Sequence, residues 1–395
     1  MLERMIYGKI TQGGSNLKSQ EKTVEINENG YTEILPDDGH SLSKVGVSVF
    51  VGDGADQLIK VKAYTADEWN VYSSTKTHFT SLMKNIDWTE FNKKQRTNFE
   101  GFFKYCDAKT IDIANLDVSN ATSFKEMFYY CQSIESIDVS NWDTSSVTDM
   151  SSMFFQCTKL KNIDVSNWDT SNVISMNSMF SGASLASINV SNWDTSKVTT
   201  MSGMFGSCDF TSIDLSSFDT SNVTDMRNMF TYCTALTSID LSSFDTSKVT
   251  ALGDLFNQCG KLTSINVSNW DTSSVTDMQN TFSYCKSLTS IDLSSWNTIN
   301  VTFLSSMFDN CSNLVDIVWG NNWASKSTCT EVRASACPLS KASIQALANK
   351  IADKTGMNRT YTVKLKSSQR SLFTEDELTA LANQFTSKNW TLAWA

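Results

Sequence analysis

Residues 136–180 read SIDVSNWDTSSVTDMSSMFFQCTKLKNIDVSNWDTSNVISMNSMF, and the phrase IDVSNWDTS occurs in them twice, 26 residues apart. The aromatic residue of this phrase recurs along the chain in steps of 25 or 26, at Trp142, Trp168, Trp193, Phe218, Phe244, Trp270 and Trp296. Weaker copies place Phe91 and Leu116 at the same position upstream, and Ile317 with Trp319 continue the pattern downstream. A fixed period of this length is typical of stacked repeats, and it predicts about nine to ten coils between residues 82 and 323.

Each repeat contains two apolar patterns. Around Ile137 and Val139, apolar and polar side chains alternate, which predicts a strand with one buried face. Met150, Met153, Phe154 and Cys157 follow the spacing i, i+3, i+4, i+7, which predicts a short helix with one apolar face. One coil is therefore expected to run strand, corner, helix, corner.

A single unit of this kind cannot bury its own apolar face, so the copies must stack. The spacing of Leu160, Ile163, Val165 and Trp168 fits the leucine-rich-repeat core LxxLxLxxN, with Trp in place of Asn. The expected fold class is an α/β repeat: a leucine-rich-repeat solenoid with one continuous parallel sheet. The expected domains are a β module over 1–80, the solenoid over 81–325, and an α/β capping domain over 326–395.

Composition narrows the function. Residues 107–320 hold 23 acidic and 9 basic residues, which argues against nucleic-acid binding because phosphate contacts need clustered Lys and Arg. The two histidines, His40 and His78, offer little for a His-based catalytic relay or metal site. The N-terminus has no apolar core of a secretory signal, and no apolar run is long enough to span a membrane. We expect no enzyme activity, no cofactor, no nucleic-acid partner and no membrane insertion.

The outward strand position is the candidate binding face. It is occupied by Asp112, Asp138, Asp164, Asn189, Asp214, Asp240, Asn266 and Asp292, and Val318 ends the column. In an in-register parallel sheet these carboxylates lie about 5 Å apart, and their repulsion must be relieved by cations, hydroxyl groups or solvent. Two interpretations stay open: a solvated polar face repeated by duplication, or a face that binds glycans or a basic protein, with Ca²⁺ bridging pairs of carboxylates.

Two further columns have structural interpretations. The aspartates that follow the aromatic anchor are expected to cap the corner; they are Asp143, Asp169, Asp194, Asp219, Asp245 and Asp271. A cysteine column is expected to supply small buried thiols; it comprises Cys106, Cys131, Cys157, Cys208, Cys233, Cys259, Cys285 and Cys311, with Ala183 in the gap. Cys329 and Cys337 fall outside this column, and they either pair or remain free thiols.

The repeat wording carries a family resemblance. The segments SNWDTSSVTDMSSMF at 140–154 and SSFDTSNVTDMRNMF at 216–230 resemble the BspA-type surface-protein repeats found among mycoplasma lipoproteins. The resemblance implies exposure on a bacterial surface and a role in adhesion. Such an adhesin normally has an export signal, which is not found here.

The flanking segments resemble phage and prophage tail proteins. At the N-terminal end the resemblance rests on Glu28–Thr32 and Ser43–Val47, within a predicted pair of strands around 24–26 and 45–51. At the C-terminal end it rests on Leu372–Thr374 together with residues 387–393, SKNWTLA. That end is also predicted to hold helices from Ile344 to Ile351 and after the capping box at Thr374, alternating with strands at 361–365 and 390–394.

The first hypothesis is therefore a non-enzymatic bacteriophage virion protein, a tail or fibre component released by host lysis. It would bind other virion proteins through the N-terminal module, bind a host surface protein or glycan through the solenoid, and form a homo-oligomer within the assembly. The alternative is a bacterial cell-surface adhesin of the BspA-like family. A second alternative is a tail-associated polysaccharide-degrading enzyme, although repeat symmetry makes the aspartates nearly equivalent, whereas a catalytic pair needs unlike environments.

Overall fold

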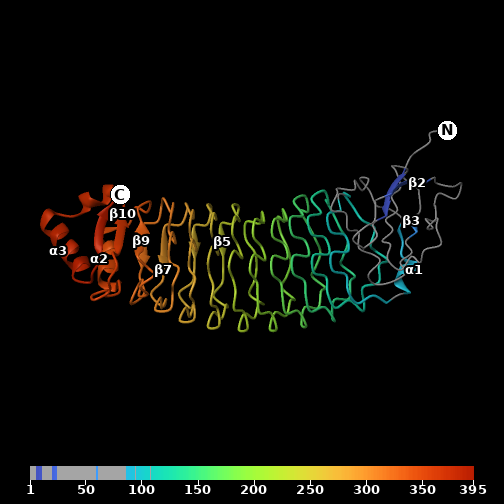
Figure 1. Cartoon of the computed structure of the whole chain (residues 1–395), viewed down its shortest axis with the longest axis horizontal. Coiled ribbons are helices and arrows are strands. Elements are labelled where there is room, and N and C mark those ends of the chain that lie inside the picture. Colours follow the sequence, from blue (N-terminus) through green and yellow to red (C-terminus); the bar gives the residue numbers. More distant parts are fainter. Residues whose placement is uncertain (1–5, 11–19, 25–58, 61–85, 94, 107) are drawn as a thin grey trace. The chain divides into compact units, whose positions relative to one another are not determined.

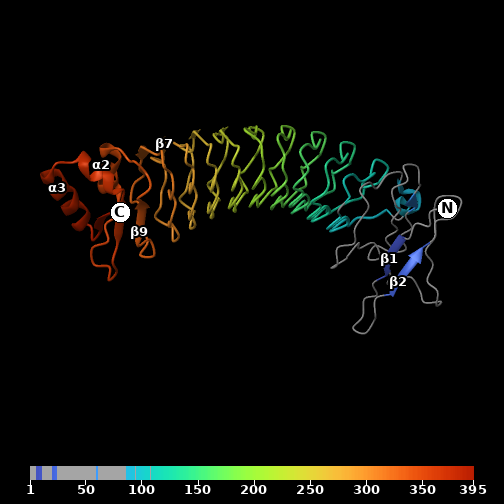
Figure 2. The ribbon, with the colours of Figure 1, turned by 90° about the horizontal axis from the view of Figure 1, so that it is seen from above.

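The structure is a computed structural model that describes residues 6–10, 20–24, 59–60, 86–93, 95–106 and 108–395. The chain divides into two compact units. The first comprises residues 1–173 and 182–192, and the second comprises 174–181 and 193–395. Within each unit the repeats form coils that lie side by side (Figures 1 and 2). The coarse prediction of a repeat solenoid is thus confirmed.

The strand segments have the predicted alternation but little regular sheet. Ile137 and Val139 are buried while Asp138 between them is exposed. Over residues 95–106 and 108–325, regular strands occur only as the parallel pairs of β5 (Ser238–Ile239) with β6 (Ser264–Ile265), and of β7 (Ser290–Asp292) with β8 (Asp316–Val318).

The expected continuous sheet along this face is therefore wrong. In the coil of Asp138, the backbone N–H of Ser140 donates to Asp138 Oδ1 at 3.2 Å. The same bond recurs in most of the coils, including those of β5 and β7, where Ser242 N donates to Asp240 and Ser294 N donates to Asp292.

The predicted helix of each coil is absent over residues 95–106 and 108–325. The apolar residues Met150, Met153, Phe154 and Cys157 are completely buried as expected, but they lie in consecutive turns. Alternate amides donate to the next coil, as from Phe128 N to Met153 O at 2.8 Å, whereas Cys131 N donates locally to Phe128 O. A helix would direct every amide along its own axis, so stacking replaces helical pairing with bonds between coils.

These turns require left-handed backbone at two positions four residues apart. The φ angles of Ser152 and Gln156 are 55° and 58°. The pairs in the other turns are Gly101/Tyr105, Glu126/Tyr130, Ser178/Gly182, Gly203/Ser207, Asn228/Tyr232, Asp254/Gln258, Asn280/Tyr284 and Ser306/Asn310. Most are not glycine, which is why the sequence pattern alone did not reveal them.

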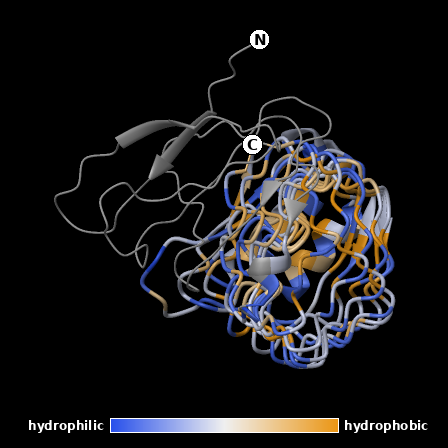
Figure 3. Ribbon diagram, turned by 90° about the vertical axis from the view of Figure 1, so that its right-hand side faces the viewer, coloured by the Kyte–Doolittle hydropathy of each residue, from blue (hydrophilic) through white to orange (hydrophobic). Residues whose placement is uncertain are grey.

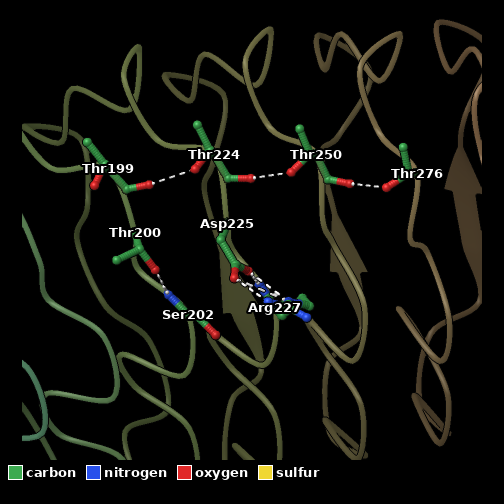
Figure 4. Close-up of polar contacts among 8 residues, drawn as sticks. All are labelled: Thr199, Thr200, Ser202, Thr224, Asp225, Arg227, Thr250 and Thr276. Carbon is green, nitrogen blue, oxygen red and sulfur yellow. Dashed lines mark hydrogen bonds and ion pairs between the residues drawn. The ribbon is translucent and has the colours of Figure 1, made fainter.

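A regular ladder of parallel backbone bridges does run through the coils. It lies where the turns that replace the predicted helix begin. In the second unit it passes through Ser175, Thr200, Asp225, Ala251, Asp277 and Phe303. Beside it, the exposed Thr224, Thr250 and Thr276 each donate a hydroxyl hydrogen bond to the backbone carbonyl of the preceding coil's threonine, at 3.1–3.2 Å (Figure 4). The threonine column therefore reinforces the ladder on the outside of the coil.

The core consists of stacked aromatic and aliphatic columns. In the first unit, Phe128 stacks between Phe103 and Phe154 with ring centroids 5.3 and 5.2 Å apart. Trp168 is 2% exposed, and its indole Nε1 donates to Val139 O at 3.0 Å. Viewed from the end, apolar residues gather inside the coils and polar residues are frequent along their outer loops (Figure 3). The aromatic register predicted from the repeat spacing is confirmed.

The C-terminal segment follows the predicted α/β pattern. Its helices are α2 (Lys341–Lys350) and α3 (Glu375–Thr386), with the short 3-10 helix η1 (Ser367–Leu372) between them. Its strands form a parallel sheet in the order β11 (Thr391–Trp394), β10 (Thr362–Leu365) and β9 (Glu331–Ala334). Strand β9 was not predicted.

The capping box at the start of α3 is present: Thr374 Oγ1 accepts from Glu377 N, and the Glu377 carboxylate accepts from Thr374 N. Helix α2 packs on the last coil. Ser343 Oγ accepts from Ile317 N at 3.0 Å, and Ser343 O accepts from Trp319 Nε1 at 3.0 Å.

At the N-terminal end, β1 (Ile6–Ile10) pairs antiparallel with β2 (Gln20–Val24), and β3 (Ile59–Lys60) pairs in parallel with β4 (Ile86–Asp87), which precedes α1 (Thr89–Asn92). The predicted strand over 45–51 and the segments that resemble tail proteins at 28–32 and 43–47 lie outside the described residues.

Contacts between coils also continue beyond residue 325, where the sequence pattern placed the start of the capping domain. Thr328 Oγ1 donates to Thr302 O at 2.9 Å, and Cys337 Sγ donates to Phe308 O at 3.3 Å.

Candidate functional site

The outward strand column is a polar face in both units. Asp112, Asp138, Asp164 and Asn189 belong to the first unit, and Asp214, Asp240, Asn266 and Asp292 belong to the second. All are exposed except Asp112, which is half-buried. Val318, which ends the column, is 52% exposed.

Most members of the column are held by the serine two residues later. Asp164 Oδ1 accepts hydrogen bonds from Ser166 N at 3.1 Å and from Ser166 Oγ at 2.7 Å. Asn189 accepts the same two bonds from Ser191, at 3.2 and 2.8 Å. Because Asp and Asn make the same turn, their exchange at this position changes charge with little change in geometry. The serines that flank the column, visible in the sequence, are therefore the groups that orient it.

These hydrogen bonds also stabilise the ionised form of the carboxylates. The Ser166 hydroxyl, with help from its backbone N–H, lowers the pKa of Asp164 below its ordinary value. The pKa of Asp240 is lowered by the backbone and side-chain bonds from Ser242, against a smaller opposing effect of the Asp214 charge. The face is therefore negatively charged at neutral pH, and Asp214 lies close enough to Asp240 for its charge to affect the pKa of Asp240.

A shallow hollow marks the face between these two aspartates. Its volume is about 300 Å³, and it opens between the coils of Asp214 and Asp240. The hollow is lined by Ser212, Ile213, Asp214, Leu215, Ser216, Asp240, Ser242 and Ser243. The two coils concerned have Phe218 and Phe244 at the anchor position where most of the others have Trp.

Metal binding on this face stays a prediction. Among the described residues, no group of three or more His, Cys, Asp and Glu side chains is placed to hold a metal ion. Calcium usually takes six to eight oxygen ligands, whereas the Oδ1 atoms of the column are already used by their own serines.

The corner aspartates cap as predicted, although they cap a corner and not a helix. Asp143 Oδ1 accepts from Ser145 N and Ser145 Oγ at 3.0 and 2.7 Å, which lowers the pKa of Asp143. The sequence interpretation missed the threonine between them. Thr144 is 1% exposed, and its hydroxyl group donates to Asp169 O in the next coil at 2.9 Å. The sequence did contain a signal for this role: the same Thr recurs from repeat to repeat, two residues after the aromatic anchor.

The cysteine column is a set of buried free thiols, as predicted. From Cys131 onward, each Sγ of the column donates to a phenylalanine carbonyl of the preceding coil, as from Cys157 to Phe128 O at 3.2 Å. Burial raises the pKa of Cys233 to about 12, so the thiol stays protonated at neutral pH. Cys337 makes the same contact with Phe308 O, so placing it outside the column was wrong: it stands 26 residues after Cys311. Cys329 and Cys337 are both free.

Comparison with known proteins places the repeat in a family. The stacked coils with their parallel backbone bridges define a repeat solenoid protein. The family model described as "Mycoplasma protein of unknown function, DUF285" matches residues 70–187, 155–259 and 233–337, which together cover more than half of the chain. The chain therefore belongs to the DUF285 family.

Other comparisons add little. A solved structure of a leucine-rich repeat protein from Bacteroides ovatus ATCC 8483 is 15% identical, and the alignment covers 98% of both chains with a TM-score of 0.38. A TM-score this low does not establish a common fold. No curated protein matches the chain. Among the described residues, no helix has the length and apolar character needed to cross a membrane.

Proposed function

We propose that this protein is a non-enzymatic adhesin of a bacterial cell surface, which binds a basic partner through the exposed strand face of its coils. The observation that carries the proposal is the column of outward Asp and Asn side chains, most of which are oriented by the serine two residues later. A preoriented row of carboxylates binds cationic groups with little loss of side-chain entropy. The acidic excess over residues 107–320 steers the same kind of partner toward the coils.

The lack of distinction among the carboxylates supports a binding role over catalysis. Asp164, Asp214 and Asp240 are all exposed, and each accepts bonds from the serine two positions later. A hydrolytic pair needs one carboxyl group with a raised pKa beside one with a lowered pKa, whereas the pKa values of these three are all lowered.

Membership of the DUF285 family supports the surface adhesin over the virion protein. The repeats that resemble bacterial surface proteins make up most of the matched region. The resemblance to tail proteins rests on short terminal segments, and the matches described above include no phage tail protein. The proposal therefore takes the bacterial surface as the location, with the virion component as the competing sequence-based hypothesis.

Location distinguishes the two hypotheses directly. Antibodies against the purified chain should label intact cells of the source organism, and protease treatment of those cells should remove the signal. The control is a cytoplasmic protein that becomes detectable only after lysis. Signal confined to phage particles released by lysis would reject the surface location and favour the virion component.

A further inference from the structure

A cluster of four aromatic rings lies on the turn segments of the first unit, apart from the strand segments that carry the aspartate column. Tyr129 is the centre: its ring lies 5.8 Å from Tyr105, 4.8 Å from Tyr130 and 5.0 Å from Phe155 between centroids. Tyr105 is 49% exposed and Tyr130 is 36% exposed. The cluster therefore presents aromatic surface to solvent from three neighbouring turns.

The coils do not need these rings in order to stack. The buried ring column formed by Phe103, Phe128 and Phe154 already joins the same turns. At the positions equivalent to Tyr129, later coils have small or polar residues, namely Ser181, Gly206, Thr231, Asn257, Ser283 and Asp309. The structure thus tolerates small side chains where this unit has adjacent aromatic ones.

Two of the rings also stand on strained backbone. Tyr105 and Tyr130 have φ angles of 63° and 59°, in the left-handed region that disfavours bulky residues. The equivalent positions elsewhere hold Gln156, Gly182, Ser207, Tyr232, Gln258, Tyr284 and Asn310, so tyrosine also occurs at this position outside the cluster. The left-handed backbone is therefore a general feature of these turns, and the cluster is set apart by the aromatic residues at the preceding position, Tyr129 and Phe155.

The charges around the cluster are balanced. Lys104 forms an ion pair with Glu126, and its Nζ lies over the ring of Tyr129 at 4.5 Å from the centroid. Lys125 pairs with Glu100 at 3.0 Å. The aromatic cluster therefore combines stacked rings, tyrosine hydroxyl groups and a fixed ion pair. It has no local excess of positive or negative charge, in contrast to the acidic strand face.

We propose that the cluster of Tyr105, Tyr129, Tyr130 and Phe155 is a binding platform for a neutral sugar ring. The apolar face of a pyranose stacks on tyrosine rings, which lose little side-chain entropy on binding. The sugar hydroxyl groups bond to the tyrosine hydroxyls and to the Lys104–Glu126 pair. Charge balance favours a neutral glycan over a charged one, and this site acts independently of the aspartate column.

The test measures binding of the full-length chain to the neutral tetrasaccharides maltotetraose, cellotetraose and chitotetraose by titration calorimetry. Saturation-transfer NMR then detects contact between aromatic protons and the sugar. The variants Tyr129→Ser and Tyr130→Asn install residues that occupy equivalent positions in other coils, so the coils should still fold. Tyr232→Asn is the matched control, because Tyr232 is 53% exposed on the same left-handed position and makes no ring contact with the described residues.

We expect at least one of these sugars to bind, and each cluster variant to weaken that binding by about tenfold or more, while Tyr232→Asn binds as the wild type does. Replacing strand-face aspartates by asparagine should leave this affinity unchanged, which separates the platform from the proposed adhesin face. The proposal is overturned if none of the sugars binds at about 1 mM, or if the folded cluster variants bind as tightly as the wild type.

Discussion

The hydroxyl group of Thr144 donates a hydrogen bond to the backbone carbonyl oxygen of Asp169 in the following coil, at 2.9 Å. Each group lies in the corner that follows the buried aromatic anchor of its own coil, and Thr144 is 1% exposed. The same bond recurs from Thr195, Thr220, Thr246, Thr272 and Thr298 to the corners that follow them. The threonine of each DTS corner is thus a buried polar link between neighbouring coils.

We expect Thr144→Val to lower the free energy of unfolding by about 1 kcal/mol, because the substitution removes the hydrogen bond that the buried Thr144 hydroxyl donates to the partly buried Asp169 carbonyl oxygen. Urea unfolding followed by tryptophan fluorescence measures the change. The matched control is Thr148→Val, whose hydroxyl bonds to Thr122 O at an exposed position that water can satisfy. Equal losses of unfolding free energy in the two variants would mean that the corner bond contributes no more to stability than the exposed bond does.

Trp168 should tolerate phenylalanine far better than alanine. Trp168→Ala removes a buried indole and should cost about 3–5 kcal/mol. Trp168→Phe reproduces the anchor residue found at Phe218 and Phe244, and should lose mainly the bond from Nε1 to Val139 O. Thermal unfolding monitored by circular dichroism gives the ranking. A small effect of Trp168→Ala would contradict the stacking register.

The left-handed turn positions should discriminate between substitutions by shape. Asn228 has a φ of 59°, and the equivalent position one coil earlier is Gly203 with a φ of 65°. Asn228→Val should destabilise the protein by about 1–2 kcal/mol, because a β-branched residue is strained in this conformation, whereas Asn228→Gly should be close to neutral. If urea midpoints show valine to be as well accepted as glycine, the turn geometry described here is incorrect.

Lys354 should make the stability of the C-terminal segment depend on alkaline pH. Its Nζ is buried against Ser325 O at 2.6 Å and lies 4.9 Å from the centre of the Tyr361 ring. Burial lowers the pKa of Lys354 from 10.5 to about 8. Between these two values the unfolded chain binds more protons than the folded chain, so raising the pH favours the folded state.

We therefore expect the wild type to gain stability relative to Lys354→Met as the pH rises from 8 to 10, as measured by urea unfolding of both proteins at each pH. Comparison with this variant cancels the titration of groups that both proteins share. A difference that stays constant across this range would show that Lys354 keeps an ordinary pKa in the folded protein.

Repeat spacing was enough to predict which side chains are buried. Burial depends on whether a side chain points to the inside or the outside of the coil, and not on the exact backbone path. Ile137, Val139 and Trp168 are buried and Asp138 is exposed, as expected. The capping box of Thr374 and Glu377 also gave the start of α3, since that signal is local.

The turns at Ser152 and Gln156 could not be predicted in the same way. An i, i+3, i+4, i+7 pattern fits a helix as well as two consecutive left-handed turns, and only bonds to the next coil separate them. The platform at Tyr129 also went unnoticed in the sequence, because it depends on which rings stacking brings together.

The central claim is that the charge of the strand face mediates adhesion, and one competition experiment tests it most directly. Asp138, Asp164, Asp214 and Asp240 are replaced together by asparagine, which keeps the serine-oriented turn already seen at Asn189. Soluble wild-type protein and the quadruple variant then compete with cells of the source organism for attachment to its natural substratum. We predict that the wild type reduces attachment and that the folded variant does not; equal competition by both proteins, or by neither, would contradict the account.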